Sequence, residues 1–166
     1  MSRSAANPLN LLLLDVFKLD SPKQLLEMCK RITSLFAYSS QCDAILKACR
    51  HTHCIKLGLV EPVKTRWSSY IECLSSVLVN KLSLQQAIVT PKIAGVIDPV
   101  LRDQMLSEST FVSIGDLLNL LQPVKHLIAV AEEDNSNAAT MLRSYYAFED
   151  RVVNQPSNGG TSCFKF

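Results

Sequence analysis

Apolar side chains recur every three or four residues along most of this chain, and this period limits most strongly how it can fold. In residues 22–38 the recurring apolar positions are Leu25, Met28, Cys29, Ile32, Leu35 and Phe36. Side chains at this spacing share one face of an α-helix, whereas a half-buried strand needs strict alternation. The nearest approach to alternation, "AIVTPKIAGVI" (87–97), contains a proline and a glycine that argue against a central strand. We therefore predict an all-α fold with a bundle-like packing of about seven helices.

Capping residues and prolines predict where the helices of the first third begin. Asn7 as a cap and Pro8 in the first turn open a helix that runs to about Leu19. Ser21 is a suitable N-cap for the next helix, with Pro22 as its first residue. The stretch "SSQCDAILKACR" (39–50) predicts a third, shorter helix whose inward residues are Ala44, Ile45 and Ala48.

Gly58 and Pro62 mark residues 51–64 as a connection, after which a helix is predicted to start at Thr65. A second helix capped by Ser83 runs to Ile88, and a short one lies near residues 99–107. The stretch from 111 to 134 predicts a long helix kinked at Pro123, and residues 137–150 predict the last helix. The Gly-, Ser- and Asn-rich residues 151–166 are expected to be a disordered tail, so residues 1–150 form the single domain. The helix from Thr65 has a continuous apolar stripe: Trp67, Tyr70, Ile71, Leu74, Val77 and Leu78.

Charge is unevenly distributed along the 166 residues, although the net charge is only +2. Residues 18–66 hold nine Lys and Arg against four Asp and Glu, whereas residues 67–150 hold five against ten. A basic half beside an acidic half is compatible with a surface that faces a polyanion. It is equally compatible with two halves that simply attract each other, so charge alone does not identify a partner.

The six cysteines are expected to be reduced thiols, because no export signal is present and a secretory route is not indicated. The apolar run Leu11–Leu14 is stopped by Asp15 and is much shorter than the roughly 20 residues that cross a membrane. We therefore expect a nuclear or cytoplasmic protein without a membrane partner.

Chemistry-bearing clusters are few. "CRHTHC" places Cys49, His51, His53 and Cys54 within six residues, but zinc sites usually join two separated pairs, so a helix end with an exposed loop is the better interpretation. His126 has no activated serine or cysteine that we can name as its partner. No glycine-rich phosphate loop is present. We accordingly predict no metal, no cofactor, no small-molecule substrate and no catalytic residue.

Trp67 is the single tryptophan, and Lys64 and Arg66 stand within three residues before it. Its phase with the apolar stripe is typical of a core residue. The same position, in the first turn of a helix beside two cations, also suits an indole that stacks on a base while amides and cations face phosphate. A partly buried indole with one face near the surface satisfies both interpretations.

Three stretches resemble hAT-superfamily transposases and proteins derived from them. "VEPVKTRWSSYIECLSSVLVNKLSLQQAI" resembles the segment in which a "TRW-S" stretch opens a helix of the all-helical insertion in the family's RNase H-like domain. "SAANPLNLLLLDVFKLD" resembles the "CAAHxLNLLLxDI" stretch before that insertion, and "LLQPVKHLIAVAEEDNSNAATMLRSYYAFED" resembles its later part. The resemblance runs over the chain to about residue 150, and its three landmarks occur in the family's order.

The departures from this family pattern bear directly on activity. Ser4 and Asn7 stand where the family has a Cys-x-x-His pair. The family's three metal-holding carboxylates flank the resembling region, so no Asp or Glu of this chain maps onto a catalytic position. The resemblance thus implies a catalytically incomplete, transposase-derived fragment that is not an enzyme.

The resemblance also assigns Trp67, with Arg66 beside it, to DNA handling, where the family's tryptophan stacks on an unpaired base at the transposon end. The first hypothesis is a helical domain that contacts DNA weakly through Lys64, Arg66 and Trp67. The alternative is a helical scaffold that binds protein partners and has no role with nucleic acid. Salt dependence separates the two, because phosphate contacts make affinity fall steeply with salt.

Overall fold

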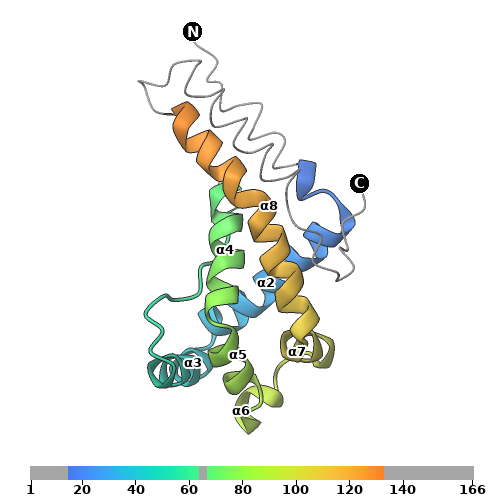
Figure 1. Cartoon of the computed structure of the whole chain (residues 1–166). Coiled ribbons are helices and arrows are strands. Elements are labelled where there is room, and N and C mark those ends of the chain that lie inside the picture. Colours follow the sequence, from blue (N-terminus) through green and yellow to red (C-terminus); the bar gives the residue numbers. More distant parts are fainter. Residues whose placement is uncertain (1–14, 64–66, 133–166) are drawn as a thin grey trace.

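A computed structural model describes residues 15–63 and 67–132, and within these ranges it contains seven helices and no strand (Figure 1). The all-α prediction is therefore confirmed. Of the helix predicted at 8–19 the structure describes only residues 15–19, in which Asp15 and Val16 are helical and residues 17–19 form a turn and a bend, so the helix ends earlier than predicted. Residues 8–14, the helix predicted at 137–150 and the tail 151–166 lie outside the described residues. In chain order the helices are α2 (Asp20–Tyr38), α3 (Ser40–Thr52), α4 (Trp67–Val79), α5 (Lys81–Ile88), α6 (Pro91–Ala94), α7 (Pro99–Leu106) and α8 (Glu108–Glu132).

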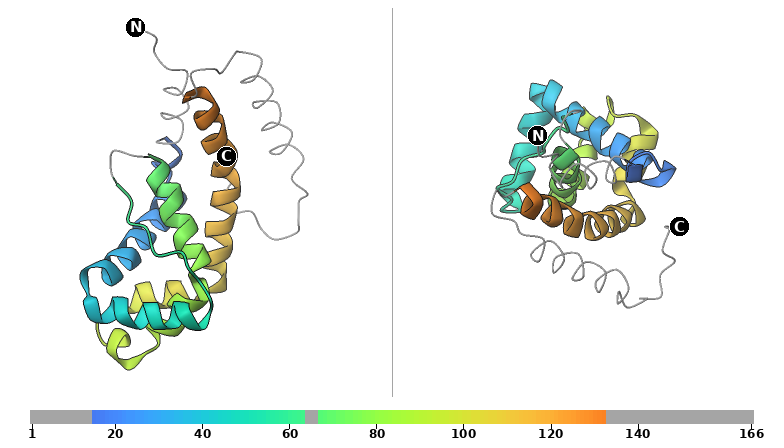
Figure 2. Two further views of the ribbon diagram at one scale, coloured as in Figure 1. Left: turned by 90° about the vertical axis from the view of Figure 1, so that its left-hand side faces the viewer. Right: turned by 90° about the horizontal axis from the view of Figure 1, so that it is seen from above.

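Helices α4 and α8 run antiparallel and side by side, and α2 crosses both of them (Figures 1 and 2). An ion pair between Glu72 of α4 and Lys125 of α8, 3.9 Å long, joins the first half of one helix to the second half of the other. At the opposite end of the molecule α3 packs on α5, and α7 packs on both α5 and α8. All of these helices bury their apolar faces in one core, whose removal from water drives folding. The largest fully buried side chains are Ile32, Ile71, Leu74, Leu84, Ile88, Ile93, Met105, Ile114, Leu117 and Leu121.

The apolar stripe of α2 agrees with the sequence, but the predicted cap does not. Ser21 was expected at the N-cap, yet Leu19 occupies that position and makes no side-chain capping bond. Pro22 is consequently the third helical residue and is buried. A proline is tolerated there because the first amides of any helix lack an intrahelical acceptor.

Helix α3 begins as predicted but turns a different face inward. Ser39 is its N-cap and accepts a hydrogen bond from the Cys42 amide at 3.3 Å. Ala44 and Ala48, expected to be inward, are exposed, and the buried residues are Cys42, Leu46 and Cys49. Unpaired cysteines behave as small hydrophobic residues, so they redirect the buried stripe.

Ser83 was also predicted to be a cap, and this prediction was wrong. Helix α5 starts at Lys81 with Asn80 at its cap position, and Ser83 is fully buried inside the helix. By contrast, the helix predicted near 99–107 is confirmed as α7, where the Asp98 carboxylate accepts the Leu101 amide at 3.0 Å. The long helix is confirmed as α8, with Pro123 inside it.

Among the described residues, no helix combines the length and the hydrophobicity that crossing a bilayer requires.

Candidate nucleic-acid interface

Of the site residues chosen from the sequence, the structure describes only the backbone of Trp67. The described part of α4 begins at Trp67, and the predicted helix start at Thr65 lies outside the described residues. Lys64 and Arg66, like Ser4 and Asn7, lie outside the described residues, and the side chain of Trp67 is not described either. The partly buried indole therefore stays a prediction. What the structure fixes is the helix that follows the motif and the segment that precedes it.

Behind Trp67, the apolar stripe of α4 is buried as predicted. Ile71, Leu74 and Val77 are at most 1% exposed, and Tyr70 and Leu78 pack against the same core. The ring of Tyr70 meets Phe17 edge-on, with centroids 5.3 Å apart at 78°. The first turns of α4 are thereby anchored in the core.

A cation from α2 also reaches the beginning of α4. The ammonium of Lys30 lies 5.5 Å from the centroid of the Tyr70 ring, a distance typical of a cation–π contact. The same ammonium pairs with Glu27 at 2.8 Å. Because Tyr70 follows Trp67 by three residues, Lys30 brings positive charge within about one helical turn of the motif.

The sequence did not point to a row of buried polar side chains on α4, consisting of Ser69, Ser76 and Asn80, which we call the polar seam. Each is at most 3% exposed, and together they hydrogen-bond the segment 57–63 that leads to the motif. The Asn80 amide donates to the carbonyl of Leu57 at 3.0 Å, and the Ser76 hydroxyl accepts from the Val60 amide at 3.0 Å. This connection has no ladder partners of its own, so the seam satisfies backbone groups that would otherwise be unpaired.

Ser69, at the end of the seam next to the motif, binds Val63 twice. Its hydroxyl accepts from the Val63 amide at 2.8 Å and lies 3.1 Å from the Val63 carbonyl, to which it can donate. The signal that could have revealed the seam is its spacing. Serines seven residues apart, followed by an asparagine four residues later, lie near one face of an otherwise apolar helix.

The four candidate metal ligands of "CRHTHC" lie in different surroundings. Cys49 is buried in the core, whereas His51 and Cys54 are exposed at the end of α3. His53 Nε2 lies 2.9 Å from Gln86 Oε1, within hydrogen-bonding distance. In residues 15–63 and 67–132, no three His, Cys, Asp or Glu side chains are grouped as a metal site.

The other thiols and the remaining histidine do not form a nucleophilic pair in the described part of the chain. Burial raises the pKa of Cys73 to about 12, although a hydrogen bond with Thr33 and the Lys30 charge oppose the shift. Burial, with the neighbouring Cys73, likewise raises the pKa of Cys29. Both cysteines stay protonated near neutral pH and are therefore poor nucleophiles. His126 is exposed on α8.

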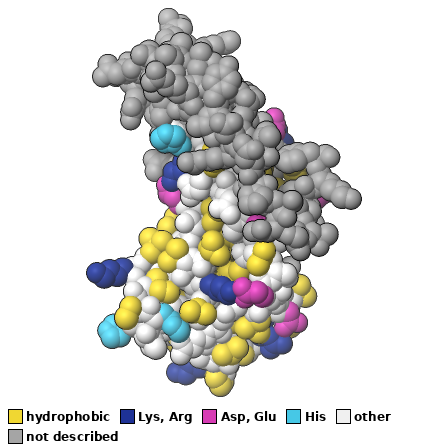
Figure 3. Space-filling model, viewed as in Figure 1, with side chains coloured by type: hydrophobic (Ala, Val, Ile, Leu, Met, Phe, Trp, Pro, Cys, Tyr) yellow, Lys and Arg dark blue, Asp and Glu magenta, His cyan; other side chains and the backbone are white. Residues whose placement is uncertain are grey.

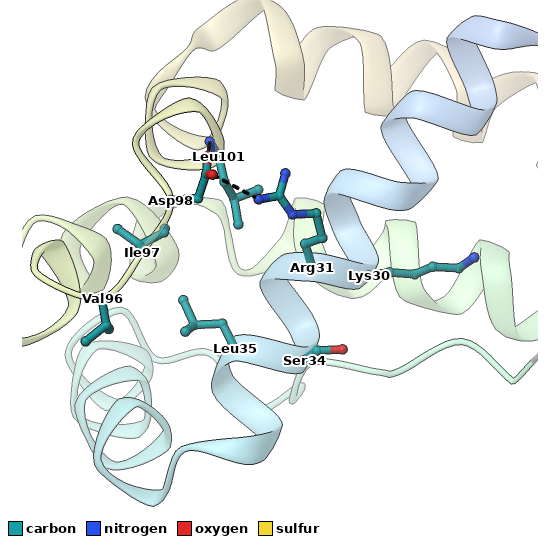
Figure 4. A pocket seen from close by; sticks show the side chains of 8 residues that line it. All are labelled: Lys30, Arg31, Ser34, Leu35, Val96, Ile97, Asp98 and Leu101. Atoms are coloured by element: carbon teal, nitrogen blue, oxygen red, sulfur yellow. Dashed lines mark hydrogen bonds and ion pairs between the residues drawn. The ribbon is translucent and has the colours of Figure 1, made fainter.

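A shallow cleft of about 520 Å³ lies between α2 and the turn from α6 to α7 (Figure 4). Arg31 points across it to Asp98, with a nitrogen–oxygen distance of 3.4 Å, while Lys30 points away from this pair. The backbone N–H of Leu101, and then Arg31, hold the pKa of Asp98 below its ordinary value. The cleft's charged groups are thus already paired within the fold. Its walls are Lys30, Arg31, Ser34, Leu35, Val96, Ile97, Asp98 and Leu101.

Several cations of the described surface are paired with nearby acids. Lys18, Lys30 and Lys47 each pair with an acid three or four residues earlier, and Arg31 bridges the basic half of the chain to Asp98 in the acidic half. On the face seen in Figure 3, Lys and Arg are scattered among apolar and acidic side chains. The described part of this face therefore carries no broad basic patch.

Comparison of the chain with known protein families, curated proteins and solved structures finds no significant match.

Proposed function

We propose that this chain is a catalytically incomplete, hAT-transposase-derived helical domain that contacts DNA weakly through Lys64, Arg66 and Trp67. The observation that supports this most directly is that α4 is helical from Trp67 onward, with the two cations within three residues before Trp67 in the sequence. The first amides of a helix carry partial positive charge and lack intrahelical acceptors, so this position suits a phosphate. An indole beside it supplies a stacking surface for an unpaired base.

The packing behind the motif supports the same proposal. Tyr70, Ile71 and Leu74 hold the first turns of α4 in the core, so the helix end is rigidly placed. Lys30, which is paired with Glu27, lies over the Tyr70 ring about one turn from Trp67. The preferred ligand is single-stranded or hairpin DNA, because stacking needs a base that is not already paired.

DNA binding is best tested by fluorescence anisotropy with a labelled hairpin whose end carries unpaired bases. We expect Trp67→Ala to weaken binding more than Lys64→Ala, because it removes stacking worth about 1–3 kcal/mol per base. Binding should also weaken with salt, with a slope of about −0.7 per phosphate contacted on single strands. Tryptophan fluorescence quenching by the same hairpin reports the contact directly.

Lys92→Ala is the matched control, because Lys92 is an exposed cation on α6. It should change hairpin affinity far less than Arg66→Ala does. Equal affinity for wild type, Trp67→Ala and Arg66→Ala would contradict the proposal.

The same proposal includes the absence of strand cleavage and joining, since no Asp or Glu maps onto the family's catalytic positions. With Mg²⁺ or Mn²⁺ the purified protein should leave hairpin and plasmid DNA intact. Nicking that persists through purification and is abolished by replacing one of this chain's own acids would overturn this part.

The alternative function, a scaffold for protein partners, is favoured by one specific observation. Large apolar side chains are exposed on helices and in the turn from α6 to α7, among them Leu82 (57%), Val96 of that turn (65%) and Val100 (62%). A scaffold would bind its partner with little dependence on salt and would be indifferent to Trp67→Ala. Anisotropy without any salt-dependent hairpin binding would favour this alternative.

A further inference from the structure

The cleft between α2 and the turn from α6 to α7 combines an apolar floor with a charged wall (Figure 4). Ile97 and Leu101 are 6% and 4% exposed and belong to the core, whereas Val96 is 65% exposed. Leu35 points from α2 toward Val96 and Ile97. An apolar group laid on this floor would be removed from water together with Val96, so the cleft favours a ligand with an apolar part.

Arg31 and Asp98, on the charged wall, are unequally satisfied. Asp98 caps α7, where its Oδ1 accepts the Leu101 amide at 3.0 Å, and its Oδ2 faces Arg31. Arg31 has five N–H donors, yet within the described part of the chain its ion pair is a single Nη2 contact of 3.4 Å. The two side chains are 51% and 46% exposed, so this pair contributes little to stability. Arg31 can therefore bind another acceptor while Asp98 keeps its bond to α7.

The other polar side chains of the cleft are already engaged. Lys30 pairs with Glu27 at 2.8 Å and points away from Arg31, and Ser34 donates to Glu61 at 2.9 Å. The unused capacity of the cleft is thus one planar guanidinium beside an apolar floor. A carboxylate matches that group with two parallel hydrogen bonds. A nucleic-acid backbone fits less well, because its binding grooves gather several cations along the strand.

We propose that this cleft is a docking site for an acidic segment of a protein partner, in which an apolar side chain packs on Val96 and Ile97 and an adjacent carboxylate pairs with Arg31. A protein segment is preferred to a small molecule because the cleft is shallow, whereas small-molecule sites bury most of their ligand. The inference uses no residue of the proposed DNA contact and does not depend on it. It gives the scaffold alternative a defined surface.

The test uses three acetylated and amidated hexapeptides in which leucine alternates with glutamate, glutamine or lysine. Each peptide is titrated into the isotope-labelled whole chain, and NMR follows the amides of Val96, Ile97 and Leu101 and the Nε–H of Arg31. We expect the glutamate peptide to shift these signals and to bind about three- to tenfold more tightly than the glutamine peptide, because it alone supplies a charge-assisted pair. The lysine peptide should bind no better than the glutamine peptide.

Two variants and a matched control assign the effect to the charged wall. Arg31→Gln should weaken binding of the glutamate peptide about three- to tenfold, to the level of the glutamine peptide. Asp98→Asn keeps a capping acceptor for α7 but releases Arg31, so it should strengthen binding of the glutamate peptide about two- to fivefold, the factor typical of an exposed ion pair. Arg102→Gln should leave the affinity unchanged, because Arg102 pairs with Asp103 and does not line the cleft. Circular dichroism and urea unfolding identify any variant that does not fold.

Three results would overturn the proposal. The first is equal binding of the glutamate and glutamine peptides, or no shift of the cleft signals with either. The second is binding of the lysine peptide that Asp98→Asn weakens, since the recognising group would then be the acid. The third is hairpin DNA that shifts the Arg31 signal and loses affinity in Arg31→Gln, which would make the bound anion a phosphate. If Arg31→Gln does not fold, Asp98→Asn and the glutamine peptide on wild type decide the same question.

Discussion

Helix α4 is buried on two faces by different forces. One face is apolar, with Ile71, Leu74 and Val77 packed in the core formed with α2 and α8. The other is the polar seam, which hydrogen-bonds the segment 57–63. Apolar packing is non-directional and gives most of the stability, whereas a hydrogen bond fixes one donor to one acceptor. The comparison teaches that α4 is held in the fold by one face, while the other sets where the chain enters the motif.

The apolar face should have the larger effect on stability. Leu74 is fully buried, and Leu74→Ala should lower the free energy of unfolding by about 2–5 kcal/mol, because it removes buried methyl groups and leaves a cavity. Urea unfolding measures this change. Leu82→Ala, at a leucine that is 57% exposed, is the control and should stay within about 0.5 kcal/mol. A similar cost at both positions would show that α4 is not packed as described.

Cys73 lies on the buried side of α4, and it should make the free energy of unfolding depend on pH. Its pKa rises from an ordinary 9.0 to about 12 in the fold, so above pH 9 the unfolded chain binds fewer protons than the folded one. Stability contributed by the neutral thiol is complete below pH 9 and is lost as pH rises toward 12. At about pH 10.5 the loss should be about 2 kcal/mol.

Other groups also titrate in this range, so the measurement is a difference between variants. Urea unfolding of wild type and Cys73→Ala, each compared between pH 8 and about 10.5, isolates the thiol. Cys73→Ala should be less stable than wild type at pH 8, and its free energy of unfolding should fall less between pH 8 and about 10.5. Parallel pH profiles would contradict the raised pKa.

The apolar face could be predicted from the sequence, and the seam could not. The stripe through Ile71 and Leu74 depends only on a period of 3.6 residues, which the amino-acid pattern displays directly. The burial of Ser76 and Asn80 depends on a segment some twenty residues earlier lying against them, which is a tertiary fact. The errors at Ser21 and Ser83 have a related origin. A serine was taken as a local helix cap, while its real surroundings are set by packing.

The candidate site shows the same division. The pattern predicted a helix over this stretch, and the structure shows α4 from Trp67 onward. It did not reveal that Ser69, two residues later, binds back to Val63, because both bonds depend on the path of the preceding connection. The arrangement of Lys30 over Tyr70 was equally invisible, since it joins residues 40 positions apart. Positions that follow from the helical period could thus be predicted from the sequence, whereas contacts between separate segments of the chain could not.

A substitution at Ser76 tests the polar seam at a distance from Trp67, and it has the smallest expected effect. Ser76 accepts the Val60 amide at 3.0 Å and donates to the Cys73 carbonyl at 2.8 Å. Ser76→Ala should cost about 1 kcal/mol, because the Val60 amide loses its acceptor while the helix carbonyl keeps its own backbone partner. The adjacent Ser75→Ala, at a less buried serine, should change stability by less than about 0.5 kcal/mol. Hydrogen exchange at Val60 should accelerate in the first variant alone. If Ser76→Ala instead cost as much as Leu74→Ala, the seam would carry the fold as well as guide the chain, and the distinction between the two faces would fail.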